Sequence, residues 1–321
     1  MKSTSTTPAM ALSDAATGTL DRIPEVDLSG LHDPQARPAI DAALLHAAET
    51  VGFVVLRNAP FPQAVRDRAF AESARFFAQS QAEKTRLLYS DTQANHGFVA
   101  LGQEALDPTQ PADRKESFTM RDVQRTAKQS ARWPDPEFRD AACAMDAAAR
   151  QLAAEVMAAF GRELGVPPDH FEQRHTGQNQ TLRYLSYPGT TEIGQPTDDA
   201  IGAGAHTDYG SVTLLWQDGN GGLEVRLQDG RWFAVPPDPE AIVLNIGDLL
   251  ERWTHGRLRS TLHRVRRFAS EAGRQSIAFF SDPDDAVLIE TLPSCLPADG
   301  VSRYPTVTAG EHIAAKLAAT Y

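Results

Sequence analysis

The chain has 321 residues, enough for one large domain or two small ones, and its 41% hydrophobic and 23% charged residues are typical of a globular protein. Its 42 acidic and 31 basic residues give a formal net charge of −11, which argues against broad binding to nucleic acids or anionic membranes. No apolar run approaches the roughly 20 residues needed to span a bilayer, and the two cysteines, Cys143 and Cys295, form no Cys-x-x-Cys pair, which argues against a disulfide framework and a thiolate metal site.

The organisation along the chain is predicted from composition. Residues 1–19 are mostly Ser, Thr, Ala and Gly with scattered other residues and contain no apolar signal core, so we expect a disordered lead-in and no export signal. The sparse cysteines fit a reducing cytoplasm. Residues 20–321 are predicted to form one domain, with a helix-rich part at 20–178, a β core at 179–290 and a C-terminal segment and helix at 291–321.

The first half alternates short strands with helices. A strand is predicted at Ile23–Leu28 and another at Phe53–Leu56, where an apolar β run is broken by the following Asn-Ala-Pro. Glycine and proline punctuation then predicts three helices, at about Pro38 to Gly52, Pro62 to Leu88 and Pro136 to Leu164.

Residues 91–133, between the second and third helices, are rich in loop signals. Gly97, Gly102, Pro108 and Pro111 interrupt the segment. A structureless link of this length inside a compact domain is unusual and is often functional, so the segment is interpreted as a lid or pocket-shaping loop.

From Gln180 onward the pattern changes to short strands separated by turn residues. This spacing predicts an antiparallel double-sheet jelly roll, and the fold class is therefore mainly β with flanking helices. A last helix is expected at about Ala309 to Ala319. The predicted strands are Leu182–Tyr187, Val212–Trp216, Leu223–Leu227, Trp232–Val235, Ala241–Ile246, Leu258–Phe268, Gln275–Ser281 and Val287–Glu290.

His206 and Asp208 are the first candidate metal ligands. Side chains two residues apart on an extended segment point to the same face, so both groups can enter one cavity. Alone, a His-x-Asp triplet is weak, because it usually arises by chance in a turn.

His263 strengthens the metal hypothesis. It stands in the β-type stretch Ser260–Val265, 55 positions beyond Asp208, so a barrel could bring the two segments face to face. Two imidazoles and one carboxylate leave open positions on an octahedral metal, as iron(II) oxygenases require. A zinc hydrolase can use the same ligand types, but no His-Glu-x-x-His helix occurs and the ligands fall on strands.

Arg274 and Ser276 form a candidate anion site. They share one face of a strand that continues into the apolar run Ile277–Phe280, which is typical of a strand buried on both faces. An arginine that leads into a buried strand needs a partner, and a bound carboxylate would supply one.

Together these blocks resemble the isopenicillin N synthase-like branch of the iron(II)/2-oxoglutarate-dependent dioxygenases. The resemblance covers nearly the whole chain after the lead-in and depends on several ordered blocks rather than on one. The blocks are Ile23–Leu28, Val51–Asn58, Asp113–Phe118, His206–Leu215, Gly221–Val225, Asn245–Gly256 and Arg259–Val265, followed by Arg274 and Ser276.

The resemblance implies a role for each matched residue. Iron would be bound by His206, Asp208 and His263, and the distal carboxylate of 2-oxoglutarate by Arg274 and Ser276. The family's tyrosine before a proline, which also contacts the co-substrate, matches Tyr187. The chain departs from the family pattern at residues 58–60, which read Asn-Ala-Pro instead of Asn-His-Gly, and at Leu185, which stands where an Asn is usual; both departures concern the substrate side.

Two further residues are candidates for contact with the substrate. Arg183 shares a strand face with Tyr187 and could hold an anionic group, although a structural salt bridge is an equal alternative. Phe280 shares a face with Arg274 and Ser276, so it could wall the substrate pocket or simply pack in the core.

Two other features are given ordinary structural interpretations. His96 is interpreted as a loop residue, because the metal triad is complete without it. The arginine-rich stretch Arg257–Arg267 is interpreted as a strand with one solvated face, with a nucleic-acid patch as the alternative.

The activity implied by the resemblance is oxidation of a small-molecule metabolite with iron(II), 2-oxoglutarate and O2, releasing succinate and CO2. Hydroxylation is the default outcome, with desaturation or ring closure as variants. The alternatives are an oxidase of the same fold that does not use 2-oxoglutarate, fragmentation of 2-oxoglutarate itself to ethylene, and a non-catalytic binding protein. A small-molecule partner, no nucleic acid or membrane partner, and a monomer or weak homo-oligomer are expected.

Overall fold

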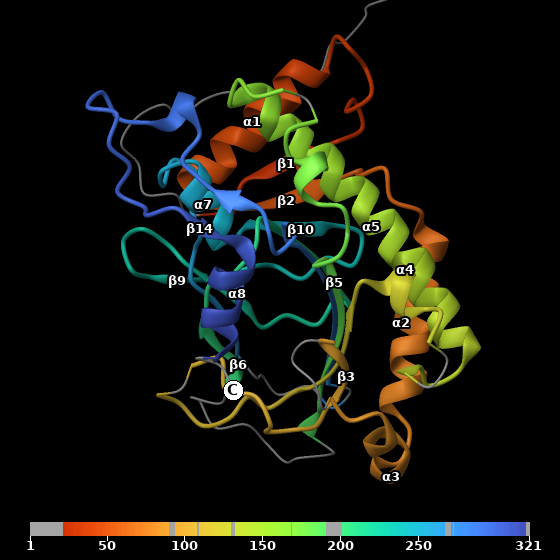
Figure 1. Cartoon of the computed structure of the whole chain (residues 1–321). Helices are drawn as coiled ribbons and strands as arrows, with labels where there is room; N and C mark the ends of the chain where they lie inside the picture. The colour runs from red at the N-terminus through yellow and green to blue at the C-terminus, as the bar shows by residue number, and fades with distance from the viewer. Residues whose placement is uncertain are drawn as a thin grey trace, which may run out of the picture.

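Two facing β-sheets form the centre of the molecule in the computed structural model (Figure 1). The structure describes residues 22–89, 94–107, 109–129, 132–167, 169–190, 201–266, 271 and 273–318. The predicted lead-in at residues 1–19 lies outside the described residues. No helix in the described ranges is long and apolar enough to cross a membrane.

The large sheet has eight strands and draws on both halves of the chain. All its neighbouring strands are antiparallel except β1 and β2, which pair in parallel. In spatial order the strands are β1 (Glu25–Asp27), β2 (Phe53–Arg57), β10 (Ile242–Ile246), β7 (Val212–Gln217), β12 (Arg274–Ser281), β5 (Thr181–Tyr187), β4 (Glu116–Arg121) and β3 (His96–Val99).

The small sheet has four strands and faces the large one. Its order is β6 (Ile201–His206), β11 (His263–Arg266), β8 (Leu223–Arg226) and β9 (Trp232–Ala234), all antiparallel. A separate hairpin pairs β13 (Leu288–Ile289) with β14 (Val307–Thr308). The mainly β jelly-roll architecture predicted from strand spacing is confirmed.

The large sheet is buried on both faces, as the apolar run in β12 predicted. Ile277 and Phe279 belong to the core cluster under the helices, whereas Ala278 and Phe280 belong to the cluster between the sheets. Successive side chains of a strand point to opposite faces, so this alternation separates a helix-covered core from an inner cavity. A long helix, α5, lies with α1 and α2 along the outer face (Figure 1).

The helices agree with most of the predicted bounds. α5 begins where Asp135 accepts a hydrogen bond from the Phe138 amide and ends just before Gly165, whose φ of +69° suits glycine. The helices are α1 (Arg37–Thr50), α2 (Gln63–Phe77), α3 (Gln81–Lys84), α4 (Val123–Thr126), α5 (Pro136–Glu163), α7 (Asp248–Trp253) and α8 (Ala309–Ala318), with 3-10 turns η1 (Thr85–Leu87), η3 (Glu172–Arg174) and η4 (Pro293–Cys295).

The prediction of one continuous second helix to Leu88 was wrong. α2 ends at Phe77, and Ser80 starts a new helix through a capping box in which Ser80 and Glu83 exchange hydrogen bonds. This box satisfies amide donors that would otherwise be left unpaired, so it favours the start of a separate helix at this position over the continuation of α2.

The interpretation of residues 91–133 as structureless was also wrong. The described part of the segment contains β3, β4 and α4, and β4 pairs with β5 along its length. His96, interpreted as a loop residue, begins β3 and is only 4% exposed, with its ring against Phe118 and Trp133. Pairing with distant strands overrode the local glycine and proline signals.

The strand predicted at Leu258–Phe268 begins only at His263, as β11, and the predicted residues 267 and 268 lie outside the described residues. Before His263 the chain packs on the end of α1, where the Arg259 amide donates to the Ala48 carbonyl. The approach is close at Gly52, where a Cβ would lie 2.1 Å from the Arg259 carbonyl oxygen. Gly52, with a φ of +75°, therefore both ends α1 and admits this segment.

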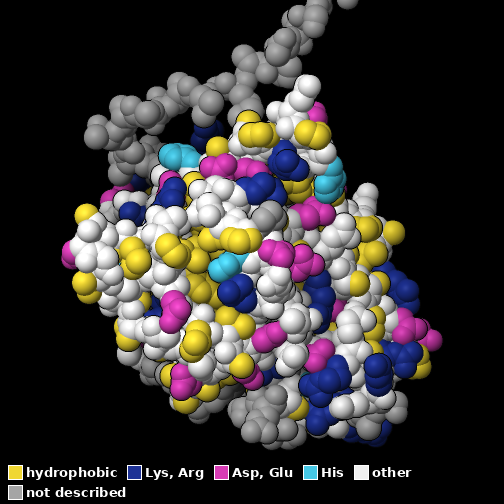
Figure 2. Space-filling view, turned by 45° about the horizontal axis from the view of Figure 1, so that its top comes forward, with side chains coloured by type: hydrophobic (Ala, Val, Ile, Leu, Met, Phe, Trp, Pro, Cys, Tyr) yellow, Lys and Arg dark blue, Asp and Glu magenta, His cyan; other side chains and the backbone are white. Residues whose placement is uncertain are grey.

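Three of the four arginines of this stretch that the structure describes are paired with acids, and the fourth, Arg259, donates to the backbone carbonyl of Glu49. Arg257 pairs with Glu49, and Arg264 pairs with Glu224 and lies over the Trp232 ring. On the face drawn in Figure 2, acidic and basic side chains are interspersed. These pairs support the structural interpretation of the stretch over the nucleic-acid alternative.

Candidate active site

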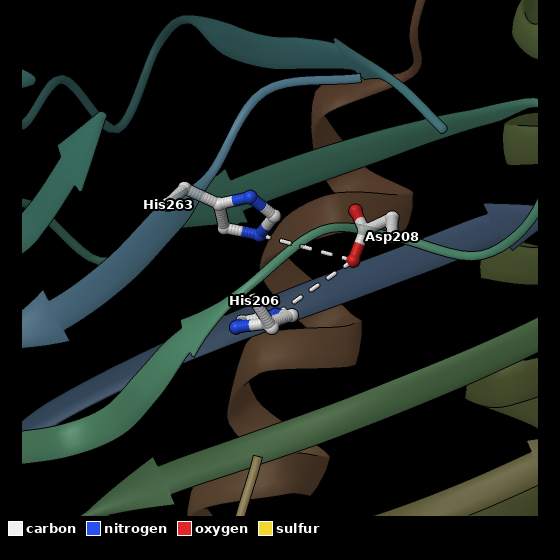
Figure 3. A group of neighbouring side chains, drawn as sticks. All are labelled: His206, Asp208 and His263. Carbon is white, nitrogen blue, oxygen red and sulfur yellow. Dashed lines mark ion pairs between the residues drawn. The ribbon is translucent and has the colours of Figure 1, made fainter. Parts of the chain in front are cut away.

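The fold brings His206, Asp208 and His263 together as a candidate metal centre. His206 ends β6 and is the direct cross-strand partner of His263 on β11. The Nε2 atoms of His206 and His263 lie 3.7 and 3.8 Å from the Asp208 Oδ1 atom (Figure 3). The three ligand atoms lie within 4.8 Å of one another, so one ion can contact all of them.

Hydrogen bonds to backbone carbonyls orient both imidazoles. The Nδ1 atom of His206 donates to the Gly204 carbonyl at 2.7 Å, and that of His263 donates to the Thr261 carbonyl at 3.2 Å. These bonds assign the proton to Nδ1 and leave Nε2 with a free lone pair toward Asp208. This is the tautomer that metal-bound histidines need.

Asp208 is fixed by two donors that the sequence analysis did not single out. Thr213 Oγ1 and Asn245 Nδ2 both donate to the Asp208 Oδ2 atom, at 2.6 and 2.7 Å. Oδ1 is thereby left for a metal. Thr213 and Asn245 are paired on β7 and β10 and lie inside matched sequence blocks, so strand parity could have pointed to them.

The protonation states suit metal binding. Burial lowers the pKa of His206 well below its usual range, and the neighbouring His263 adds to this effect, so the His206 imidazole is neutral near pH 7. Burial alone would raise the pKa of Asp208, but the two imidazoles and the hydrogen bonds from Asn245 and Thr213 outweigh it and lower that pKa. A neutral imidazole and an ionised carboxylate are the forms that bind metal ions.

Arg274 forms an anion site on the inner face of the large sheet. It is 4% exposed, and its guanidinium donates to Ser276 Oγ at 3.1 Å and to Gln217 Oε1 at 3.0 Å. It also lies over the ring of its cross-strand partner Tyr187, 4.8 Å from the centroid.

This guanidinium still has unused binding capacity. Its Nε atom is buried without a hydrogen-bond partner, and no carboxylate among the described residues forms an ion pair with it. A buried arginine without an anion is costly, so the residues fit a ligand carboxylate. Gln217 is a member of this site that the sequence analysis missed.

One cavity between the sheets connects the two sites. The metal triad, Arg274, Ser276 and Tyr187 all line it, as do Arg183 and Phe280. The segment around β3 and β4 contributes to its wall, so that part of the pocket-shaping expectation is confirmed. Near the C-terminal end of the described chain, the residues that line the cavity are Ile313 and Leu317 of α8.

Arg183 belongs to a buried, internally paired network on the cavity wall. It pairs with Glu104 and donates to Ser117 Oγ at 2.8 Å. Glu104 also lies 3.2 Å from the Lys115 ammonium, which pairs in turn with Asp113. The structural salt bridge proposed for Arg183 is therefore present, on a residue that also borders the cavity.

A row of directly paired residues crosses the inner face of the large sheet at the level of the metal centre. Successive cross-strand partners connect β4, β5, β12, β7 and β10. The row reads Arg121, Thr181, Phe280, Thr213 and Asn245. Its Thr213–Asn245 end holds Asp208, and its other end presents Arg121. Arg274 and Ser276 lie toward the opposite end of β12.

Two family models match this chain, one over its N-terminal part and one over the part that contains the metal and anion sites. Residues 176–283 match the model of the 2OG-Fe(II) oxygenase superfamily, and residues 23–136 match the N-terminal model described as non-haem dioxygenase in morphine synthesis. The chain is 30% identical to validamycin A dioxygenase of Streptomyces hygroscopicus subsp. limoneus, over 92% of this chain and 85% of that one. It is 29% identical to homoarginine-6-hydroxylase of Glycine max, over 92% and 96%.

Solved structures give the same result. The crystal structure of full-length Neurospora crassa T7H with alpha-KG (2-oxoglutarate) and thymine superposes with a TM-score of 0.81 and 30% identity. The match covers 93% of this chain and 97% of that one.

Proposed function

Because this chain belongs to the 2OG-Fe(II) oxygenase superfamily, we propose that His206, Asp208 and His263 bind its iron(II) and that Arg274, Ser276 and Tyr187 bind its 2-oxoglutarate. The chain is an iron(II)- and 2-oxoglutarate-dependent oxygenase that oxidises its substrate and releases succinate and CO2. One observation supports this assignment of residues most directly. The three possible metal ligands and Arg274, a buried arginine without an acidic partner in the described chain, line the same cavity.

The protein's own residues supply orientation and charge. Gly204 and Thr261 aim the imidazoles, while Thr213 and Asn245 hold one oxygen of Asp208 so that the other faces the ion. Arg274 neutralises the far carboxylate of 2-oxoglutarate, and Ser276 and Gln217 keep its guanidinium in place. Iron(II) with bound 2-oxoglutarate supplies the oxidative decarboxylation that drives cleavage of a substrate C–H bond.

The substrate is proposed to be a small molecule that becomes hydroxylated. The cavity lies between two sheets and has Ile313 and Leu317 of α8 in its wall, an enclosure suited to a metabolite. The relatives' names, validamycin A dioxygenase and homoarginine-6-hydroxylase, also point to small molecules. The free thiols of Cys143 and Cys295 suit the proposed cytoplasmic location.

Oxygen consumption and succinate release, measured with iron(II) and with or without 2-oxoglutarate, test this function. We expect both only when 2-oxoglutarate is present and not in the His206→Ala variant. Oxygen consumption without 2-oxoglutarate would favour the oxidase alternative, and ethylene in the gas phase would favour fragmentation of the co-substrate. Unchanged turnover in His206→Ala would refute the assigned metal centre.

A further inference from the structure

Most charged groups that line the cavity already have partners. Arg183 and Lys115 are balanced by Glu104 and Asp113. Under the proposed function, the charges of iron(II), Arg274, Asp208 and a 2-oxoglutarate dianion also cancel. Two lining side chains remain outside this balance: Arg121 at the end of β4 and Asp282 just after β12.

The side chains of Arg121 and Asp282 have no hydrogen-bond or ion-pair partner among the described residues. The Nε atom of Arg121 is buried and unsatisfied. Asp282 is partly open to the cavity but otherwise enclosed by protein. Burial raises its pKa to about 7, and the charge of Arg121 only partly opposes that effect. The two groups are close enough to influence each other but do not form a salt bridge.

Arg121 and Asp282 lie on the side of the metal centre away from Arg274. Arg121 and Phe280 both pair with Thr181, so about two strand spacings, roughly 10 Å, separate their backbones. Asp282 follows Phe280 by two residues and packs against the backbone at Gly210, where a Cβ would meet its carboxylate. Gly210 lies two residues after Asp208, so this corner adjoins the metal centre, whereas Arg274 lies toward the opposite end of β12.

We infer that this corner binds a zwitterionic substrate of the free amino acid type, whose carboxylate pairs with Arg121 and whose ammonium pairs with Asp282. One unpaired guanidinium and one unpaired carboxyl group, whose ionised form an ammonium would stabilise, favour a ligand that carries both charges and no net charge, because an unpaired buried charge is costly. A guanidinium matches a carboxylate fork, and a carboxylate accepts from an ammonium. Asn95 also lines the cavity here, and its carbonyl accepts from the Arg121 amide.

This inference rests on the proposed function, because it assumes that Arg274 is occupied by 2-oxoglutarate. The test therefore measures the two separately. Anaerobic protein is first titrated with iron(II) and 2-oxoglutarate, and loss of that binding would count against the proposed function. The loaded protein is then titrated calorimetrically with free α-amino acids, their N-acetyl and decarboxylated counterparts, and the neutral lactams thymine and uracil. No turnover is needed for this readout.

At least one free amino acid is expected to bind, with the N-acetyl and decarboxylated forms at least about tenfold weaker. Arg121→Gln and Asp282→Asn should each weaken that ligand at least about tenfold while leaving iron(II) and 2-oxoglutarate affinity unchanged, which also shows that the variants fold. Arg125→Gln, at an exposed arginine four residues after Arg121, is the matched control and should bind like the wild type.

Three results would overturn the inference. One is the absence of binding by any free amino acid to protein that holds iron and 2-oxoglutarate. Another is tighter binding of a lactam or an N-acetyl derivative than of every free amino acid. The last is amino acid binding that Arg121→Gln and Asp282→Asn leave intact.

Discussion

At the scale of single residues, Arg274 is the residue on which the proposed binding of 2-oxoglutarate depends most. Its guanidinium is buried among Ser276, Gln217 and Tyr187 without an anionic partner in the described chain. Arg274→Ala should raise the dissociation constant of 2-oxoglutarate by at least about thirtyfold, since truncating one member of a buried charge pair costs about 2–5 kcal/mol. Iron(II) affinity should change little.

Anaerobic calorimetric titration of the metal-loaded protein measures this effect, with Arg226→Ala, an exposed arginine, as the control. An Arg274→Ala variant that binds 2-oxoglutarate as tightly as the control would remove Arg274 from the site.

Thr213 tests whether the supports of Asp208 matter for metal binding. Its hydroxyl donates to the oxygen of Asp208 that faces away from the histidines. Thr213→Val keeps the side-chain shape but removes the donor, so iron(II) affinity should fall about 10–100-fold. Competition with a chelating dye under anaerobic conditions gives the affinity, and Thr306→Val, at an exposed position, serves as the control. Equal affinities in the two variants would show that the hydroxyl is dispensable.

His96 predicts a pH dependence of stability. Burial lowers its pKa to about 4 from 6.5, while its Nε2 donates to the Arg132 carbonyl at 2.8 Å. Between pH 6.5 and 4 the unfolded chain binds a proton that the folded chain rejects, so stability is fully present above pH 6.5 and falls as the pH drops. The slope from this residue reaches at most about 1.4 kcal/mol per pH unit.

His96→Gln retains a donor but cannot titrate. Its free energy of unfolding, measured with urea at pH 7 and pH 5, should decline less between the two values than that of the wild type. The same decline in both proteins would mean that His96 titrates normally. His175, whose pKa is also lowered to about 4 by burial, should retain its own contribution in both proteins.

At the scale of elements, the attachment of α8 depends on Asp248 at the start of α7. Asp248 lies 2.6 Å from the Lys316 ammonium and accepts from Ser260 Oγ at 2.6 Å. Burial would raise the pKa of Asp248, but the nearby His312 and Lys316 side chains and the hydrogen bond from Ser260 outweigh it and hold that pKa far below its usual range. This contribution is present above about pH 3.8 and is lost as the pH falls further.

Asp248→Asn should therefore loosen α8 at neutral pH. Hydrogen exchange of residues 309–318 should accelerate about tenfold or more, because the ion pair between Asp248 and Lys316, which helps to hold α8, is lost. α5 should exchange as in the wild type, and Asp299→Asn, at an exposed turn, should change neither helix. Unaltered exchange of α8 in Asp248→Asn would show that apolar contacts, such as that of Ile313, suffice to hold it.

Elements with strong periodicity or clear end signals could be predicted from the sequence. α5 follows from Asp135, Pro136 and Gly165, and β12 from an unbroken apolar run. β4, β6 and α7 could not be predicted in this way. β4 carries the polar residues Ser117 and Thr119 on its cavity face, so its alternation signals no simple core, and its pairing with β5 is a long-range contact.

The site shows the same division. His206, Asp208 and His263 share one cavity as strand parity and family resemblance indicated, and their binding roles stay predictions. The supports Thr213, Asn245 and Gln217 come from strands whose register is fixed only by folding, so strand parity can indicate which face they lie on but not which group each one contacts. Arg121 and Asp282 were missed because their importance lies in the absence of partners, which only the packed structure reveals.

At the scale of the whole molecule, the candidate site is formed by residues from both sheets. His206 and His263 come from the small sheet, whereas Arg274 and the residues that support Asp208 come from the large one. Iron and 2-oxoglutarate can bind side by side only because the jelly roll closes these sheets around one cavity. The single domain expected for residues 20–321 stays a prediction, and the pairing of β1 and β2 within the large sheet is consistent with it.

The most direct test is an anaerobic titration of iron(II), followed by 2-oxoglutarate, on the wild type, Asp208→Ala and Arg274→Ala. The wild type should bind both ligands, Asp208→Ala should bind neither tightly, and Arg274→Ala should bind iron(II) but lose 2-oxoglutarate. Tight iron(II) binding by Asp208→Ala, or unweakened 2-oxoglutarate binding by Arg274→Ala, would contradict a single shared site between the two sheets.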